Sequence, residues 1–232
     1  ARGRNHRQRQ PAMSASRERL LLLFFQEPPE DGAVRHSIGA MAGLKEAYWA
    51  KGDALSREAA MWTRDPLGCL PTARLALDCQ QLPEASSIAK ITAALGGVLY
   101  RCTGRSPLPV TLPPGSTFAG TLQLCAFHRR NGLSDAQLET LWLEEHTQVA
   151  IDTQCTLGYH QNWVVEGGPP YFDGLVEEYF PPAASTSMEA FFADGDNSDL
   201  MWQHVQRLTE SSERFLDLDR SEVIHLTDTR IF

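Results

Sequence analysis

The sequence predicts an α+β protein made of two βαββαβ halves in one chain. Two observations support this fold class. Apolar runs and helical periodicities follow one another in the same order twice. A stretch with four prolines within residues 107–114 separates the two repeats. A single βαββαβ sheet has one bare apolar face that must be covered. We therefore expect the two sheets to pack against each other.

The composition is that of a globular protein. Among 232 residues, 42% are apolar and 22% are charged. No apolar run approaches the roughly 18–20 residues of a membrane-spanning helix. Residues 20–25 are apolar and follow Arg17-Glu18-Arg19, but no small-residue cleavage site comes after them. We predict a buried strand there, a cytoplasmic location and no contact with a membrane.

Charge and cysteine spacing exclude several other classes. The net charge is −8, and residues 1–12 carry four arginines without an acidic residue, so the rest of the chain is near −12. We expect residues 1–17 to form a disordered basic arm, and we predict no nucleic-acid partner because an acidic body repels phosphates. The five cysteines form no CxxC pair, which argues against disulfides and zinc.

The second half, residues 119–232, has the clearer pattern. Residues 122–127 predict a strand, Asn131-Gly132 a turn, and Ser134 a helix N-cap with Gln137 at the capping-box position. The helix that follows carries Leu138, Leu141, Trp142 and Val149 on one face. Strands are predicted at 157–165 and 172–180, helices at 188–192 and 198–215, and a closing strand at 222–232.

The first half, residues 18–106, repeats this order more loosely. We predict strands at 20–25, 57–63, 74–79 and 98–102, and helices at 37–51 and 84–95. The first of these helices is predicted despite Gly39 and Gly43. Residues 107–118 are predicted to be a proline-rich linker between the halves.

The second half resembles the EthD family, named after a protein of ethyl tert-butyl ether degradation. The resemblance rests on Gly132-Leu133-Ser134, on Trp142 and His146 in a Trp-x3-His pattern, and on residues 159–162, 172–180 and 213–217. The predicted first helix of the other half lacks Trp-x3-His, so that half looks like a degenerate copy. The resemblance implies ferredoxin-like halves that form an intramolecular dimeric α/β barrel.

His146 is the leading candidate for catalysis, because it lies at the edge of the Trp142 stripe and its imidazole suits acid–base work near neutral pH. A hydrogen-bonded histidine at the edge of the core is the alternative. Glu145 falls near the centre of the same stripe, where a buried carboxylate needs a partner. It would orient a histidine or act as an acid, unless the helical register differs.

Two further strands carry polar candidates. His160 and Asn162 share one strand face, opposite Tyr159 and Trp163. They line a small-molecule site or they face solvent. Asp173 and Tyr179 lie on one face of the next strand, where Tyr179 would donate to a substrate oxygen. Asp173 would otherwise cap the preceding turn.

Together with the family resemblance, these residues predict a small-molecule enzyme that uses acid–base chemistry without a cofactor. The histidines are scattered and no nucleotide-binding glycine motif occurs, so no metal or nucleotide cofactor is predicted. The resemblance implies an apolar aromatic or polyketide-like substrate and a lyase, decarboxylase, cyclase or isomerase. A non-catalytic binding protein of a degradation pathway, a haem-using relative and a further homodimer stay open. The predicted catalytic residues are His146, His160 and Tyr179, and the predicted substrate-binding residues are Trp142, Asn162, Asp173 and Glu145.

Overall fold

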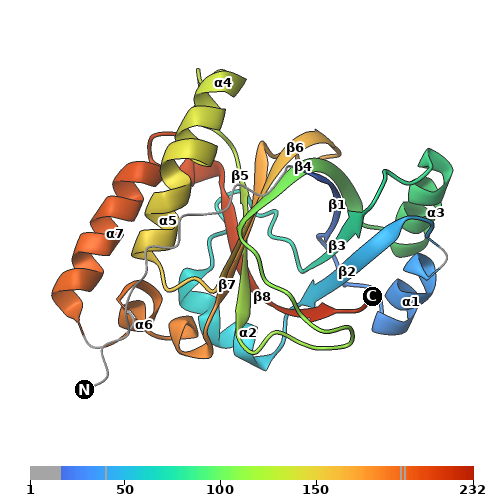
Figure 1. Ribbon diagram of the computed structural model, residues 1–232, viewed down its shortest axis with the longest axis horizontal. Coiled ribbons are helices and arrows are strands. Elements are labelled where there is room, and N and C mark those ends of the chain that lie inside the picture. Colours follow the sequence, from blue (N-terminus) through green and yellow to red (C-terminus); the bar gives the residue numbers. More distant parts are fainter. Residues whose placement is uncertain (1–16, 40, 194, 196) are drawn as a thin grey trace.

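A computed structural model describes residues 17–39, 41–193, 195 and 197–232 (Figure 1). The predicted basic arm lies outside these residues, except for Arg17, which begins the first strand. The strands are β1 (Arg17–Phe24), β2 (Leu44–Lys51), β3 (Ala73–Cys79), β4 (Val98–Leu108), β5 (Thr121–Phe127), β6 (Gly158–Gly167), β7 (Gly174–Phe180) and β8 (Glu222–Arg230). They form one closed barrel in which every neighbouring pair is antiparallel.

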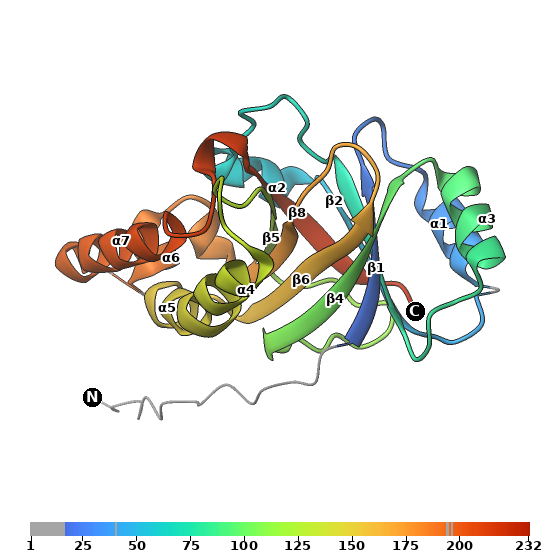
Figure 2. The ribbon, with the colours of Figure 1, turned by 90° about the horizontal axis from the view of Figure 1, so that it is seen from above.

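Helices cover the barrel on two opposite sides. In the first half, α1 (Asp31–Ile38) and α3 (Ala85–Leu95) lie on one side, and in the second half α4 (Asp135–Leu138), α5 (Thr147–Thr153), α6 (Met188–Phe192) and α7 (Ser198–Ser212) lie on the other (Figures 1 and 2). The remaining segments are the short helix α2 (Ala54–Glu58), the single turns η1 (Ala59–Trp62), η3 (Pro182–Ser185) and η4 (Leu218–Arg220), and the longer η2 (Glu139–His146), which joins α4 to α5. None of the helices in the described part of the chain has the length and apolar character needed to cross a membrane.

The strand order shows how the halves complete each other. The first half contributes β4-β1-β3-β2 and the second half β8-β5-β7-β6, so both halves use the equivalent order. The halves join at β2–β8, where Tyr48 pairs with Arg230, and at β4–β6, where Cys102 pairs with Val164. The predicted mixture of helices and strands is confirmed, and the two halves close into one eight-stranded barrel within the chain.

Residues 20–24 of β1 form an unbroken apolar run because both faces of the strand are buried there. Leu20, Leu22 and Phe24 point outward and pack under α1 and α3, in one buried cluster with residues of those helices. Leu21 and Leu23 point inward and join a second cluster inside the barrel. Because both faces are buried, the sequence lacks the apolar–polar alternation of a half-exposed strand.

Two predicted elements of the first half are wrong. The helix expected at residues 37–51 is a turn followed by β2, since α1 ends at Ile38 and Gly43 has φ +77°. The strand expected at residues 57–63 is helical, because Asp53 caps α2 by accepting a hydrogen bond from the Ser56 amide at 2.9 Å. In both places local capping and turn chemistry outweighed the apolar periodicity.

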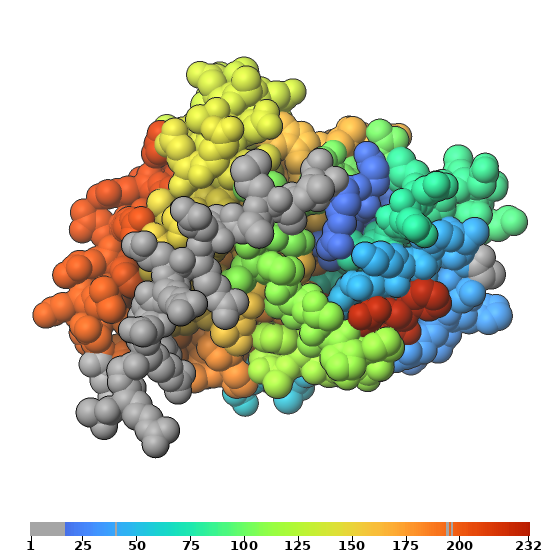
Figure 3. Space-filling view, viewed as in Figure 1, coloured from blue at the N-terminus to red at the C-terminus, as the bar shows by residue number. Residues whose placement is uncertain are grey.

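The proline-rich linker is also shorter than predicted, because β4 continues to Leu108 and includes Pro107. Residues 109–118, called the strap below, are tied to β8 by backbone hydrogen bonds, including the amide of Phe118 to the carbonyl of Asp228 at 2.8 Å. Val110, Leu112 and Phe118 pack against the apolar cluster inside the barrel. The green part of the chain that contains the strap lies at the surface in Figure 3.

Candidate functional site

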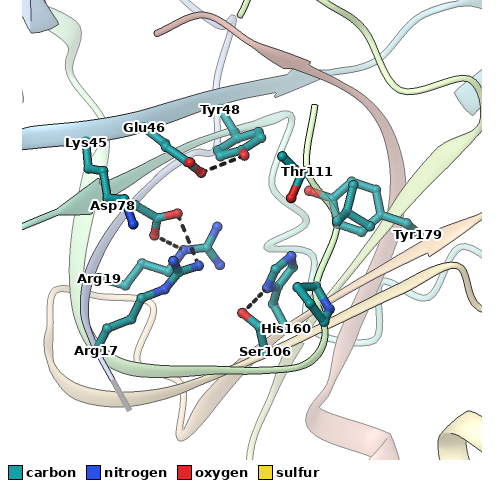
Figure 4. A pocket seen from close by; sticks show the side chains of 12 residues that line it. Arg17, Arg19, Lys45, Glu46, Tyr48, Asp78, Ser106, Thr111, His160 and Tyr179 are labelled. Atoms are coloured by element: carbon teal, nitrogen blue, oxygen red, sulfur yellow. Dashed lines mark hydrogen bonds and ion pairs between the residues drawn. The ribbon is translucent and has the colours of Figure 1, made fainter. Parts of the chain in front are cut away.

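A cavity of about 290 Å³ opens into one end of the barrel interior (Figure 4). Side chains of both halves and of the strap line it, so neither half forms it alone. The volume lies at the small end of the roughly 300–1,000 Å³ typical of ligand pockets. The lining residues are Arg17, Arg19, Lys45, Glu46, Tyr48, Asp78, Ser106, Pro109, Val110, Thr111, His160 and Tyr179.

His160 lies in this cavity because β6 alternates, placing Tyr159 under the helices and His160 inside the barrel. Its Nδ1 lies 2.6 Å from Ser106 Oγ, and its ring packs edge-on to Tyr179 with centroids 5.8 Å apart. The second ring nitrogen faces the open centre of the cavity (Figure 4). Burial, with the nearby charge of Arg19, lowers the pKa of His160 to about 3, so the imidazole is neutral at pH 7.

A buried ion-pair network, which reaches the cavity at Arg19 and Asp78, joins the two halves. Arg19 from β1 pairs with Asp78 (Nε–Oδ1, 2.8 Å) and with Glu177 of β7. Arg74 from β3 pairs with the same Glu177 (Nε–Oε1, 2.8 Å) and with Asp228 of β8 (Nη1–Oδ1, 3.3 Å). Burial favours the protonated form of Glu177, but the two arginines outweigh it and lower its pKa to about 2. Glu177 and the two arginines therefore stay charged across the ordinary pH range.

Two predicted site residues belong to this network. Asn162 is fully buried and donates through Nδ2 to Glu177 Oε2 at 3.0 Å and to the Leu175 carbonyl at 2.9 Å, while its Oδ1 accepts from Arg19. Its hydrogen-bonding capacity is used inside the protein. The Tyr179 hydroxyl donates to Asp228 Oδ2 at 2.7 Å. Burial, together with the Asp228 charge, raises the pKa of Tyr179 well above its ordinary value.

The rim of the cavity carries charges that are less deeply buried than the network, except for Asp78. Arg17 pairs with Asp78 at 3.2 Å, and Glu46 accepts from the Tyr48 hydroxyl at 2.8 Å. Glu46 also lies 3.6 Å from the guanidinium of Arg230 on β8.

Lys45 is exposed at the start of β2, on the same rim. Within residues 17–39, 41–193, 195 and 197–232, no carboxylate forms an ion pair with it. The rim therefore combines compensated charges with one unpaired ammonium group.

His146 and Trp142 lie outside the barrel, between the helices and the sheet. Trp142 is fully buried and meets Phe127 edge-on at 4.7 Å. His146 Nδ1 lies 2.9 Å from Ser211 Oγ, its ring packs on Phe215, and burial lowers its pKa to about 4. Neither residue lines the cavity in which His160 and Tyr179 lie. The structure thus separates the predicted catalytic histidines onto opposite faces of the sheet.

Glu145 and Asp173 are placed differently from their predictions. Residues 139–146 form a widened, π-helical stretch that shifts the helical register. Glu145 therefore points to solvent and pairs with Arg214, instead of lying at the centre of the apolar stripe. Asp173 precedes β7 and binds the backbone amide and Nε of Arg129 at 2.9 and 2.6 Å. It ties a loop in place, away from the inward face of Tyr179.

Sequence reasoning missed Arg19, Arg74, Asp78 and Glu177, which form the polar interior. A signal was present in β3, where Arg74 and Asp78 alternate with Leu75 and Leu77. Such a pattern normally indicates the solvent face of a sheet, because charged residues are seldom fully buried unless they are paired. Among the described residues, no group of three or more His, Cys, Asp or Glu side chains is arranged to hold a metal ion.

Comparison with known proteins gives no family assignment. No family model and no curated protein matches the chain. One similar solved structure is an anthrone oxidase-like protein, with a TM-score of 0.47, 9% identity and coverage of 93% of each chain. Another is a "Putative monooxygenase" of Fusobacterium nucleatum subsp. nucleatum, with a TM-score of 0.43, 7% identity and coverage of 93% and 94% of the two chains. Such low similarity says nothing about the activity of this chain.

Proposed function

We propose that this protein is a small-molecule enzyme that moves a proton without a cofactor, with His160 as the base in the cavity at the barrel end. One observation carries the proposal. His160 presents a ring nitrogen to the cavity while its Nδ1 is fixed 2.6 Å from Ser106 Oγ. A neutral imidazole held in this way is a typical group for general acid–base catalysis.

The chemistry that fits is enolisation followed by reprotonation. In the active tautomer, Nδ1–H donates to Ser106 and Nε2 accepts a proton from an acidic C–H of the substrate. The electron pair of the broken C–H bond then moves into a carbonyl and forms an enolate. The imidazolium returns the proton to the same carbon or to another carbon, which completes an exchange or an isomerisation. An anion beside the ring raises the pKa of His160, because opposite charges favour the imidazolium form.

Tyr179 contributes a wall of the site in this proposal. Its hydroxyl proton is already held by Asp228, so its ring, and not its oxygen, serves the substrate. His146 receives no role, because it lies outside the set of residues that line the cavity.

The proposal also includes an EthD-like second half and ferredoxin-like halves at residues 18–106 and 119–232. The equivalent strand order of the two halves supports the ferredoxin-like assignment. The capping box at Ser134 and the buried Trp142 support the part of the resemblance that starts at the Gly-Leu-Ser turn.

A binding protein without chemistry is the second candidate. It is favoured by the low pKa of His160, about 3, which makes the imidazole a weak base in the absence of a negatively charged ligand.

Proton exchange in D2O separates the two candidates. Phenylpyruvate and acetoacetate, which carry acidic C–H groups, would be incubated with the protein and followed by ¹H NMR. We expect the wild type and His36→Gln, which changes an exposed histidine of α1, to accelerate exchange equally. His160→Gln should reduce the rate to that of the buffer. Binding without exchange would establish the second candidate, and loss of exchange in His146→Gln alone would overturn the assignment of the base.

A further inference from the structure

We propose that the ligand of this cavity is an organic carboxylate with one flat apolar group, bound with its carboxylate at Lys45 and its apolar group against the strap and Tyr179. One part of this inference, that the reactive carbon of the ligand lies near His160, rests on the proposed function. It adds the chemical class of the substrate and its orientation.

The charge balance of the site points to an anion. Four cationic groups meet four carboxylates in and below the cavity. The neighbouring ion pairs are Arg17–Asp78, Arg19–Glu177, Arg74–Asp228 and Arg230–Glu46. Lys45 lines the same cavity and pairs with no described carboxylate, so the site as a whole carries one positive charge at its rim. A carboxylate of the ligand would complete the balance.

The rim is also the least costly place for a charged group. Lys45 is exposed, so a carboxylate bound there keeps part of its hydration. Deeper in the barrel, the carboxylate of the ligand would lose its hydration and would be repelled by Glu177 and Asp228, which are fully buried. The carboxylate is therefore expected to remain at the mouth while the rest of the ligand enters.

The wall opposite the rim offers apolar and aromatic surface beside the polar side chains of Ser106, Thr111 and His160. Pro109 and Val110 of the strap line it together with the ring of Tyr179. The ring of Phe118 supports Tyr179 from behind, edge-on at 5.0 Å. In Figure 4, Tyr179 and His160 lie on one side of the cavity and Lys45 with Arg17 on the other. A ligand that spans the cavity must accordingly be polar at one end and flat and apolar at the other.

The size of the cavity limits the apolar part. At about 290 Å³ it lies at the lower end for ligand pockets, which favours a single ring with a short carboxylate chain over a fused ring system. In such a ligand, the carbon between the carboxylate and the ring would lie near the second nitrogen of His160.

Calorimetric titration with matched probes tests this inference. The probes are phenylacetate, its neutral isostere phenylacetamide, and acetate, which lacks the ring. We expect phenylacetate to bind at least fivefold more tightly than either of the others. Lys45→Gln should weaken phenylacetate about fivefold and leave phenylacetamide unchanged, since a partly exposed charge pair contributes up to about 1 kcal/mol. Lys90→Gln, which changes an exposed lysine of α3, serves as the control.

The outcomes distinguish the ligand class from the proposed chemistry. Equal affinity for phenylacetate and phenylacetamide, or an equal effect of Lys45→Gln on both, would overturn the carboxylate assignment. Equal affinity for phenylacetate and acetate would overturn the apolar part. We expect His160→Gln to keep the preference for phenylacetate. If the wild-type protein prefers phenylacetate but does not accelerate proton exchange, the assignment of His160 as the base is wrong and the ligand class stands.

Discussion

Acidification should unfold this protein, because three histidines are buried in their neutral form. His146, His160 and His225 are 8%, 5% and 2% exposed. Burial lowers their pKa values to about 4, 3 and 4, from an ordinary value of 6.5. Each of them is therefore protonated in the unfolded chain and neutral in the folded chain between about pH 4.5 and 6.5. The stability they contribute is present above pH 6.5 and is lost as the pH falls toward their folded pKa values.

Glu178 acts in the opposite direction. It lies on the outward face of β7 under the helices, and burial raises its pKa to about 8 although Gln154 donates a hydrogen bond to it. Its Oε1 has no hydrogen-bond partner among the described residues. The folded protein keeps a proton that the unfolded chain releases above pH 4.5, so this group reduces stability as the pH rises from 4.5 to 8.

The magnitude follows from the number of protons. One proton corresponds to about 1.4 kcal/mol for each pH unit. Three histidines minus one glutamate leave about two protons, so the free energy of unfolding should fall by about 3 kcal/mol per unit between about pH 6.5 and 4.5. Above pH 6.5 only the glutamate effect remains, and stability should fall by about 1.4 kcal/mol per unit toward pH 8. The maximum is expected near pH 6.5.

Urea unfolding, followed by tryptophan fluorescence at half-unit intervals between pH 4.5 and 8.5, measures this profile. His225→Gln should reduce the acid slope by about 1.4 kcal/mol per unit, since it removes one titrating group. Glu178→Gln should remove most of the decline above pH 6.5. A flat profile between pH 6.5 and 5, or greater stability on acidification, would refute the reasoning.

Three further predictions concern single positions. In Gly158→Ala the new Cβ would lie 2.0 Å from Val110 Cγ2, so the strap must move. We expect the free energy of unfolding in urea to fall by about 1–3 kcal/mol and phenylacetate to bind more weakly in calorimetry. Unchanged phenylacetate binding would contradict this prediction. Glu177→Gln leaves two buried arginines under-compensated and should cost about 3–5 kcal/mol in urea unfolding, whereas a near-neutral effect would show that the network is dispensable. Trp142→Ala removes a fully buried ring and should lower the free energy of unfolding by about 3–5 kcal/mol in the same assay, while proton exchange by His160 persists. Loss of exchange in a variant that still folds would show that the outer face of the sheet affects the cavity.

The second half was more predictable than the first, and the reason is local. Ser134 and Gln137 form the predicted capping box, and the turns and strands around them follow the expected pattern. In residues 44–51, by contrast, Ala47, Tyr48, Trp49 and Ala50 are all buried. A strand with two buried faces has no alternation, so its apolar run fits a helix as well as a strand.

The candidate site could be predicted only in part. Alternation along β6 correctly placed His160 and Asn162 on one face, but the sequence did not tell whether that face is solvent or the barrel interior. The cavity depends on contacts between residues far apart in the chain, such as Ser106 with His160 and Arg19 with Glu177. Pairing across the two halves is a tertiary property that local periodicity does not contain.

The buried charges also favour pairing of the first half with the second half over pairing of two identical halves. The interior of the first half contributes Arg19, Arg74 and Asp78, a surplus of one positive charge, whereas the second half contributes Glu177 and Asp228. Two first halves, or two second halves, brought face to face would confront like charges in a dry interior. Electrostatics therefore favours pairing of a first half with a second half over self-association of either half, and a separated first half should bind the second half in preference to a copy of itself.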